Sequence, residues 1–60
     1  MSLQERLKKL NEAIEGAKER VRFFNSKGDS ELAESWDLWL MQLEVTKNGV
    51  IQQMKQNVLN

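Results

Sequence analysis

The chain has 60 residues, with no cysteine, histidine or proline, and its nine basic and nine acidic residues give a formal net charge of zero. This composition excludes disulfides, ordinary zinc sites and histidine-activated nucleophiles, and a neutral chain is a poor candidate for nucleic-acid binding. A domain of this size buries only about 60% of its unfolded surface when it folds alone, so we expect oligomerisation to add buried area.

An amphipathic helix is expected over residues 3–24. Seven apolar residues recur there at alternating spacings of four and three, which places them on one side of a helix built to pack on another helix. Ser2 followed by Glu5 forms a capping-box pattern and predicts a helix start near Leu3. The seven are Leu3, Leu7, Leu10, Ile14, Ala17, Val21 and Phe24.

Turn-forming residues interrupt this pattern at residues 25–29. Gly28 suits a left-handed backbone, and Asp29 or Ser30 suits the N-cap of a following helix. Because the connection is short, we expect the two helices to be antiparallel neighbours.

A second helix is expected over residues 30–58, continuous through Asn48 and Gly49, because one apolar stripe keeps its direction at about 100° per residue. Trp36 lies nearer the centre of this stripe than Trp39 and should be the better buried indole. The stripe consists of Leu32, Trp36, Trp39, Leu40, Leu43, Val50, Ile51, Met54 and Val58.

Folding the chain at the turn predicts an all-α, antiparallel two-helix hairpin as a single domain. The second helix exceeds the first by about 10 Å, which leaves Met54 and Val58 without cover from the first helix. Lys47 lies in the apolar stripe, where it either buries its stem or fixes the register of pairing. The expected core consists of Leu7, Leu10, Ile14, Ala17, Val21, Phe24, Trp36, Leu40, Leu43 and Val50.

A second apolar stripe, made of Leu38, Met41 and Val45, points about 180° away from the first. These residues need a partner or are ordinary scattered surface hydrophobics. We favour a partner, and we expect the hairpin to dimerise into a four-helix bundle. The predicted partner-binding residues are Leu38, Met41, Val45, Met54 and Val58.

Charge is unevenly distributed along the chain. Residues 1–27 contain seven basic and four acidic side chains, whereas residues 28–60 contain two basic and five acidic ones. We expect the two oppositely charged helices to attract each other.

No residue pattern indicates catalysis, a metal or a cofactor. Glu31, Glu34 and Asp37 are better explained as surface acids near a helix N-terminus than as a cation site, because metal sites in helical bundles place carboxylates inward and add histidine. With three scattered glycines there is no phosphate-binding loop. We therefore expect a non-enzymatic protein.

The N-terminal segment is charged in every helical turn, and the longest apolar run spans only residues 38–41. We expect neither a signal peptide nor a membrane span, and predict a soluble, cytoplasmic protein.

Residues 42–51, and within them Thr46-Lys47-Asn48 followed by Val50, resemble the C-terminal part of YvfG-like proteins, small uncharacterised helical proteins of bacilli. The resemblance covers at most half of the chain and implies a helical hairpin that pairs with a second copy. The chain is also similar in size and layout to the small aspartyl-phosphate phosphatases of sporulating bacteria. Their Ser-Gln-Glu-Leu-Asp signature is absent, so Asp37 receives no catalytic role.

The leading functional hypothesis is a self-associating helical protein that acts as a protein-interaction module or regulator. One alternative is a hairpin that folds on, and inhibits, a different protein. Another is a dimeric RNA- or DNA-binding regulator, suggested by basic residues near two aromatic rings. These residues are Lys18, Arg20, Arg22, Phe23 and Phe24.

Overall fold

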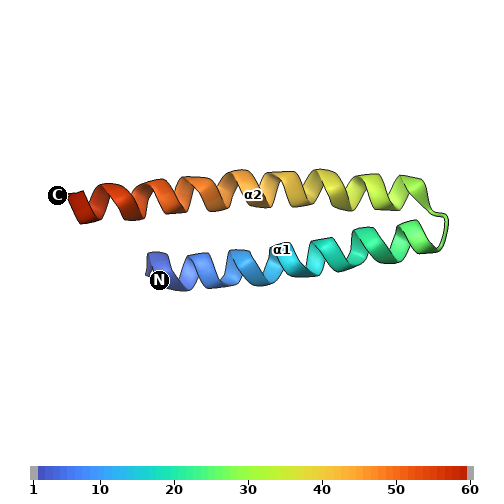
Figure 1. The fold of residues 1–60 in the computed structure, drawn as a ribbon, viewed down its shortest axis with the longest axis horizontal. Helices are drawn as coiled ribbons and strands as arrows, with labels where there is room; N and C mark the ends of the chain where they lie inside the picture. The colour runs from blue at the N-terminus through green and yellow to red at the C-terminus, as the bar shows by residue number, and fades with distance from the viewer. Residues whose placement is uncertain (1, 60) are drawn as a thin grey trace.

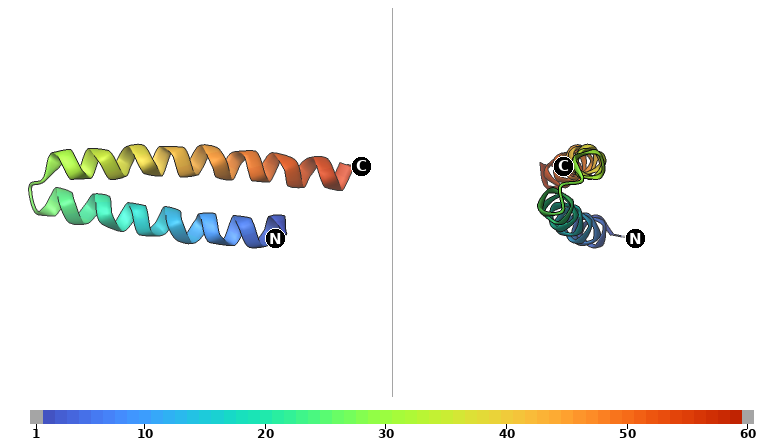
Figure 2. Two further views of the ribbon diagram at one scale, coloured as in Figure 1. Left: turned by 180° about the vertical axis from the view of Figure 1, so that it is seen from behind. Right: turned by 90° about the vertical axis from the view of Figure 1, so that its right-hand side faces the viewer.

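The computed structural model describes residues 2–59, with side chains to residue 57, as two helices, α1 (Leu3–Ser26) and α2 (Ser30–Leu59). The helices pack side by side and run antiparallel, and α2 extends past the first residues of α1 (Figure 1). The expected all-helical hairpin is therefore confirmed. Seen along the long axis of the molecule, the two helices are tilted relative to each other (Figure 2).

The first helix starts where the sequence predicts and ends two residues later. The hydroxyl of Ser2 accepts a hydrogen bond of 3.1 Å from the backbone N–H of Glu5, which satisfies one free donor of the first turn. At the other end, the hydroxyl of Ser26 donates to the carbonyl of Phe23 at 2.7 Å. Residues expected in the turn thus form the last helical turn of α1, and the connection is shorter than predicted.

The turn satisfies the free backbone groups of both helices. Gly28 has a φ of +78°, and its N–H donates to the carbonyl of Asn25 at 3.1 Å. The N–H of Asp29 donates to the carbonyl of Phe24 at 2.9 Å, which completes a Schellman motif. The Asp29 carboxylate then accepts from the N–H of Leu32 at 3.2 Å, so Asp29, and not Ser30, caps α2.

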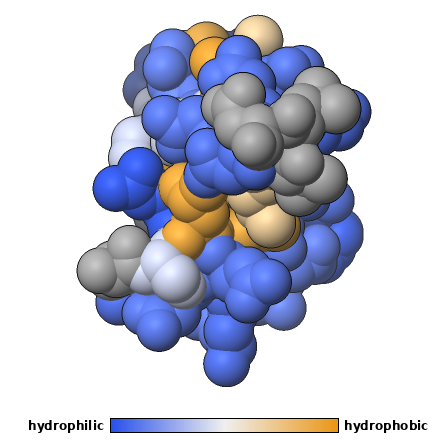
Figure 3. Space-filling view, turned by 90° about the vertical axis from the view of Figure 1, so that its left-hand side faces the viewer, coloured by the Kyte–Doolittle hydropathy of each residue, from blue (hydrophilic) through white to orange (hydrophobic). Residues whose placement is uncertain are grey.

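The buried core is small and lies along the seam between the helices. Ile14 and Ala17 of α1 contact Leu43 of α2, and three further apolar side chains pack against this cluster. Viewed from the open end of the hairpin, apolar surface lies between the helices, and more apolar surface is visible above α2 (Figure 3). The three packing side chains are Leu10, Trp36 and Leu40.

The remaining expected core residues differ in burial. Val50 is buried, whereas Leu7, Val21 and Phe24 are half-buried. Ala33, with 4% of its surface exposed, belongs to the core although it is not among the core residues expected from the sequence. It lies beside Val21 near the turn, where a small side chain suits the close approach of the helices.

The apolar stripe of α2 is covered only along its centre. Leu32 and Trp39 are 43% and 52% exposed, while Trp36 is half-buried, because one neighbouring helix covers a narrow strip and the edge of the stripe stays outside it. The expectation that Met54 lacks cover is wrong: it is half-buried, because it lies on the inward face of α2 one helical turn after Val50. The side chain of Val58 lies outside the described residues.

Candidate interaction surface

The most exposed large apolar side chains of the described chain lie on α2. Leu38, Met41 and Val45 are 64%, 57% and 68% exposed, and we call these three residues the outer stripe. Helical geometry places them opposite the side of α2 that packs on α1. The outer stripe is therefore apolar surface that the hairpin itself leaves uncovered.

A second exposed region lies at the turn end and combines aromatic rings with cations. The rings of Phe23 and Phe24 meet edge to face at 5.2 Å, and Phe23 is 52% exposed. The guanidinium of Arg20 lies 4.8 Å from the centre of a Trp36 ring and also donates to the carbonyl of Gly16 at 3.0 Å. The amine of Lys27 lies 5.6 Å from the Phe23 ring. Both cations thus interact with aromatic rings of their own chain.

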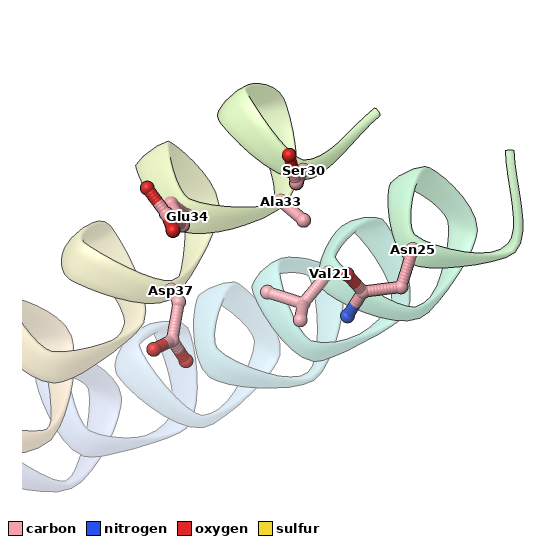
Figure 4. Close-up of a pocket in the computed structure, with 6 residues that line it drawn as sticks. All are labelled: Val21, Asn25, Ser30, Ala33, Glu34 and Asp37. Carbon is pink, nitrogen blue, oxygen red and sulfur yellow. The ribbon is translucent and has the colours of Figure 1, made fainter. Parts of the chain in front are cut away.

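Polar and charged side chains surround two shallow, open hollows along the groove between the helices. In the first, of about 310 Å³, Val21 and Ala33 lie between the helices while Asn25, Glu34 and Asp37 surround them (Figure 4). The carboxylates of Glu34 and Asp37 belong to exposed residues, so this hollow does not enclose a ligand. The second hollow is lined by Ile14, Lys18, Glu44, Lys47 and Asn48.

Among the residues whose side chains are described, no ion pair joins α1 to α2, so the expected attraction between the helices does not take this form. Within the part of the chain whose side chains are described, the ion pair present joins Lys18 and Glu15 of α1 at 3.7 Å. Lys47 is half-buried at the side of the second hollow, as a snorkelling stem would be. Packing of apolar side chains therefore carries the contact between α1 and α2.

Among the described residues, no three His, Cys, Asp or Glu side chains gather into a group that could hold a metal ion. Glu31, Glu34 and Asp37, considered above as a carboxylate cluster, are all exposed. Neither described helix combines the length and apolar character needed to cross a membrane.

Comparison with known proteins provides no relative from which a function could be transferred. No family model, no curated protein and no solved structure matches this chain. Function is therefore inferred from the surface of the hairpin, and first from the outer stripe and the neighbouring exposed Trp39.

Proposed function

We propose that this protein is a non-enzymatic, cytoplasmic helical hairpin that pairs with a second copy of itself to form a four-helix assembly. In this form it serves as a protein-interaction module or small regulator. The observation that carries the proposal is the outer stripe, because its three apolar side chains lie together on a face of α2 that the described part of the hairpin leaves exposed.

The size of the core supports the need for a partner. Five apolar side chains are buried in the described hairpin, and two of them are alanines, which contribute little apolar surface. Six large apolar side chains remain exposed, and five of these six belong to α2. Association through α2 would bury apolar surface of the kind that the single hairpin lacks.

A protein partner fits this surface better than a nucleic acid. Two cations of the turn end, Arg20 and Lys27, already lie over aromatic rings of their own chain. Base stacking would have to displace them, and Glu19 lies in the same region. The outer stripe carries no charge that could contact phosphate.

Sedimentation equilibrium of the pure protein tests the proposal directly. We expect a folded dimer whose melting temperature rises with protein concentration, because association supplies part of the stabilisation. Thermal melts followed by circular dichroism at concentrations a hundredfold apart give the second readout. A fully helical monomer with coincident melts would contradict the proposal, and a poorly helical monomer would favour folding on a different protein.

The variant Leu38→Glu tests whether the outer stripe is the surface involved. Burying an unpaired carboxylate at an interface opposes association, so we expect the dimer to weaken at least tenfold, or about 1.4 kcal/mol. Glu12→Gln, at an exposed position of α1, is the control and should leave association unchanged. An unchanged dimer in Leu38→Glu would move the interface elsewhere.

A further inference from the structure

We propose that the second copy docks antiparallel, α2 against α2, on one uncharged face of this helix, with the two-fold axis beside Gln42. This inference rests on the proposed self-association and adds the face, the direction and the register. Residues 35, 42 and 49, seven positions apart, run along the middle of this face. The uncharged face consists of Ser35, Leu38, Trp39, Gln42, Val45, Thr46 and Gly49.

The charged residues in the middle of α2 lie on another side of the helix. Asp37 borders the hollow shown in Figure 4, and Glu44 and Lys47 border the second hollow, so all three flank the groove toward α1. These three are all the charged residues between Ser35 and Gly49, so none of them lies on the uncharged face. Depletion of charge distinguishes the centres of protein interfaces from ordinary surface.

Trp39 gives the uncharged face a large exposed side chain next to the outer stripe. Leu38 and Val45 border the middle line on one side, and Trp39 borders it on the other, with more than half of the indole residue exposed. Tryptophan is enriched among the residues that dominate binding energy at interfaces. Met41 lies farther round the helix, on the side of Glu34, and is therefore at the edge of this contact.

Two polar side chains on the face are already satisfied within α2. The hydroxyl of Ser35 donates to the carbonyl of Glu31 at 3.1 Å, and the hydroxyl of Thr46 donates to the carbonyl of Gln42 at 2.9 Å. A partner helix can cover both hydroxyls without leaving an unpaired donor. Their presence is therefore compatible with burial in a dimer.

Gly49 is a helical glycine for which the hairpin provides no packing reason. A Cβ built at this position would meet no atom within 4 Å, and its backbone is regular helix, although glycine is a poorer helix former than alanine. A second helix that approaches closely at Gly49 would explain the missing side chain. With the axis beside Gln42, Gly49 faces Ser35 of the second copy, and Leu38 lies beside Val45 of the second copy.

The charge along α2 selects the antiparallel direction. Glu31, Glu34 and Asp37 lie in its first two turns, whereas Lys55 lies near its other end. A parallel pair would place the two acidic ends of α2 side by side, and like charges in such proximity oppose association. An antiparallel pair instead places the acidic end of one α2 beside the Lys55 end of the other. The same uncharged face then serves both copies, as a two-fold interface requires.

The variant Gly49→Leu tests the close approach. We expect it to raise the dimer dissociation constant at least tenfold in sedimentation while the diluted monomer keeps or gains helix content. The matched control, Asn48→Leu, places the same side chain one residue away on the charged side and should keep wild-type association. Equal effects of the two variants would overturn the close approach at Gly49.

Spin labels test direction and register, because the chain has no cysteine of its own. Labels attached to Glu44→Cys and, separately, Lys55→Cys lie off the uncharged face. An antiparallel pair centred at Gln42 separates the residue-55 labels by about 40 Å along the helix axis, and the residue-44 labels by about 6 Å. Similar distances for both labels would show a parallel pair and overturn the inference.

Failure of this inference is distinguishable from failure of the proposed function. A wild-type protein that is a stable monomer at every concentration contradicts the proposed function itself. A wild-type dimer that withstands both Trp39→Glu and Gly49→Leu, but dissociates with Met41→Glu, keeps the proposed function and overturns the uncharged face as its seam. The uncharged face is supported if Trp39→Glu raises the dimer dissociation constant at least tenfold and Asn48→Glu leaves it unchanged.

Discussion

The two helices differ in how much of their apolar surface is covered by the contact within the hairpin. Phe23 is the large exposed apolar side chain of α1, and it lies beside the turn, whereas α2 exposes five such side chains, among them the outer stripe. The apolar pattern of α1 is thus accounted for by its contact with α2. The central turns of α2 are apolar on two sides, and only one side faces α1. This difference is the reason for proposing that α2 makes a second contact.

Leu43→Ala compared with Leu38→Ala should show the largest difference between the two sides of α2. Leu43 is buried in the central cluster, so its truncation should lower the free energy of unfolding by about 3 kcal/mol. In the diluted monomer Leu38→Ala should change it by less than about 0.5 kcal/mol. Urea denaturation at low protein concentration measures both. Equal losses would mean that α2 is rotated relative to the arrangement described.

Trp36→Ala and Trp39→Ala sharpen the same comparison at neighbouring indoles. Trp36 packs against the central cluster, and its removal should lower the unfolding free energy of the diluted monomer by about 2 to 3 kcal/mol, at or below the lower limit for an aromatic core residue because it is only half-buried. Trp39→Ala should lower the unfolding free energy of the monomer by less than Trp36→Ala does, and it should weaken the dimer more. A larger loss of monomer stability for Trp39 would contradict the assignment of the two sides.

The sequence predicted the hairpin because each of its signals is local. The spacing of the apolar residues defined both helices, and Ser2, Gly28 and Asp29 supply the cap, the left-handed residue and the second cap. Burial at the edges of the seam was less predictable. Ala33 gives no periodic signal stronger than any other alanine, yet it is buried, while Leu32 belongs to the predicted stripe and is exposed. These outcomes depend on the tilt and separation of the helices, which the spacing of residues does not specify.

The candidate surface was predictable in part for the same reason. The outer stripe follows from helical periodicity alone, so its three members could be named from the sequence. The position of Arg20 over Trp36, and the positions of Asp37 and Glu44 beside two separate hollows of the groove, depend on how the two helices face each other. The sequence therefore indicated which charged and aromatic residues belong to the surface, and the packing of the two helices determined their relative positions.

Gly28→Ala tests whether the turn constrains the hairpin independently of the α2 surface. At a φ of +78° a Cβ is strained, although no neighbouring atom lies within 4 Å, so the expected loss is about 1 kcal/mol of unfolding free energy. Gly28→Asn should lose less, because asparagine tolerates the left-handed region better. Thermal melts of the two variants at one concentration give the comparison. An unchanged melt for Gly28→Ala would show that the turn relaxes to another conformation at little cost.

Arg20→Gln should have a small effect on stability, and it distinguishes the turn end of the seam from the outer side of α2. The guanidinium lies 4.8 Å from the Trp36 ring and bonds to the Gly16 carbonyl, so its loss removes a cation–π contact of about 0.5 to 1 kcal/mol at an exposed site. Because this contact joins α1 to α2 within one hairpin, monomer stability should fall by that amount while the dimer dissociation constant stays unchanged. Lys27→Gln is the control, since the Lys27 amine lies 5.6 Å from the ring of Phe23 at the end of α1 and makes no link to α2 through that ring. Urea denaturation and sedimentation of the two variants measure both quantities, and a weakened dimer in Arg20→Gln would place the turn end inside the interface.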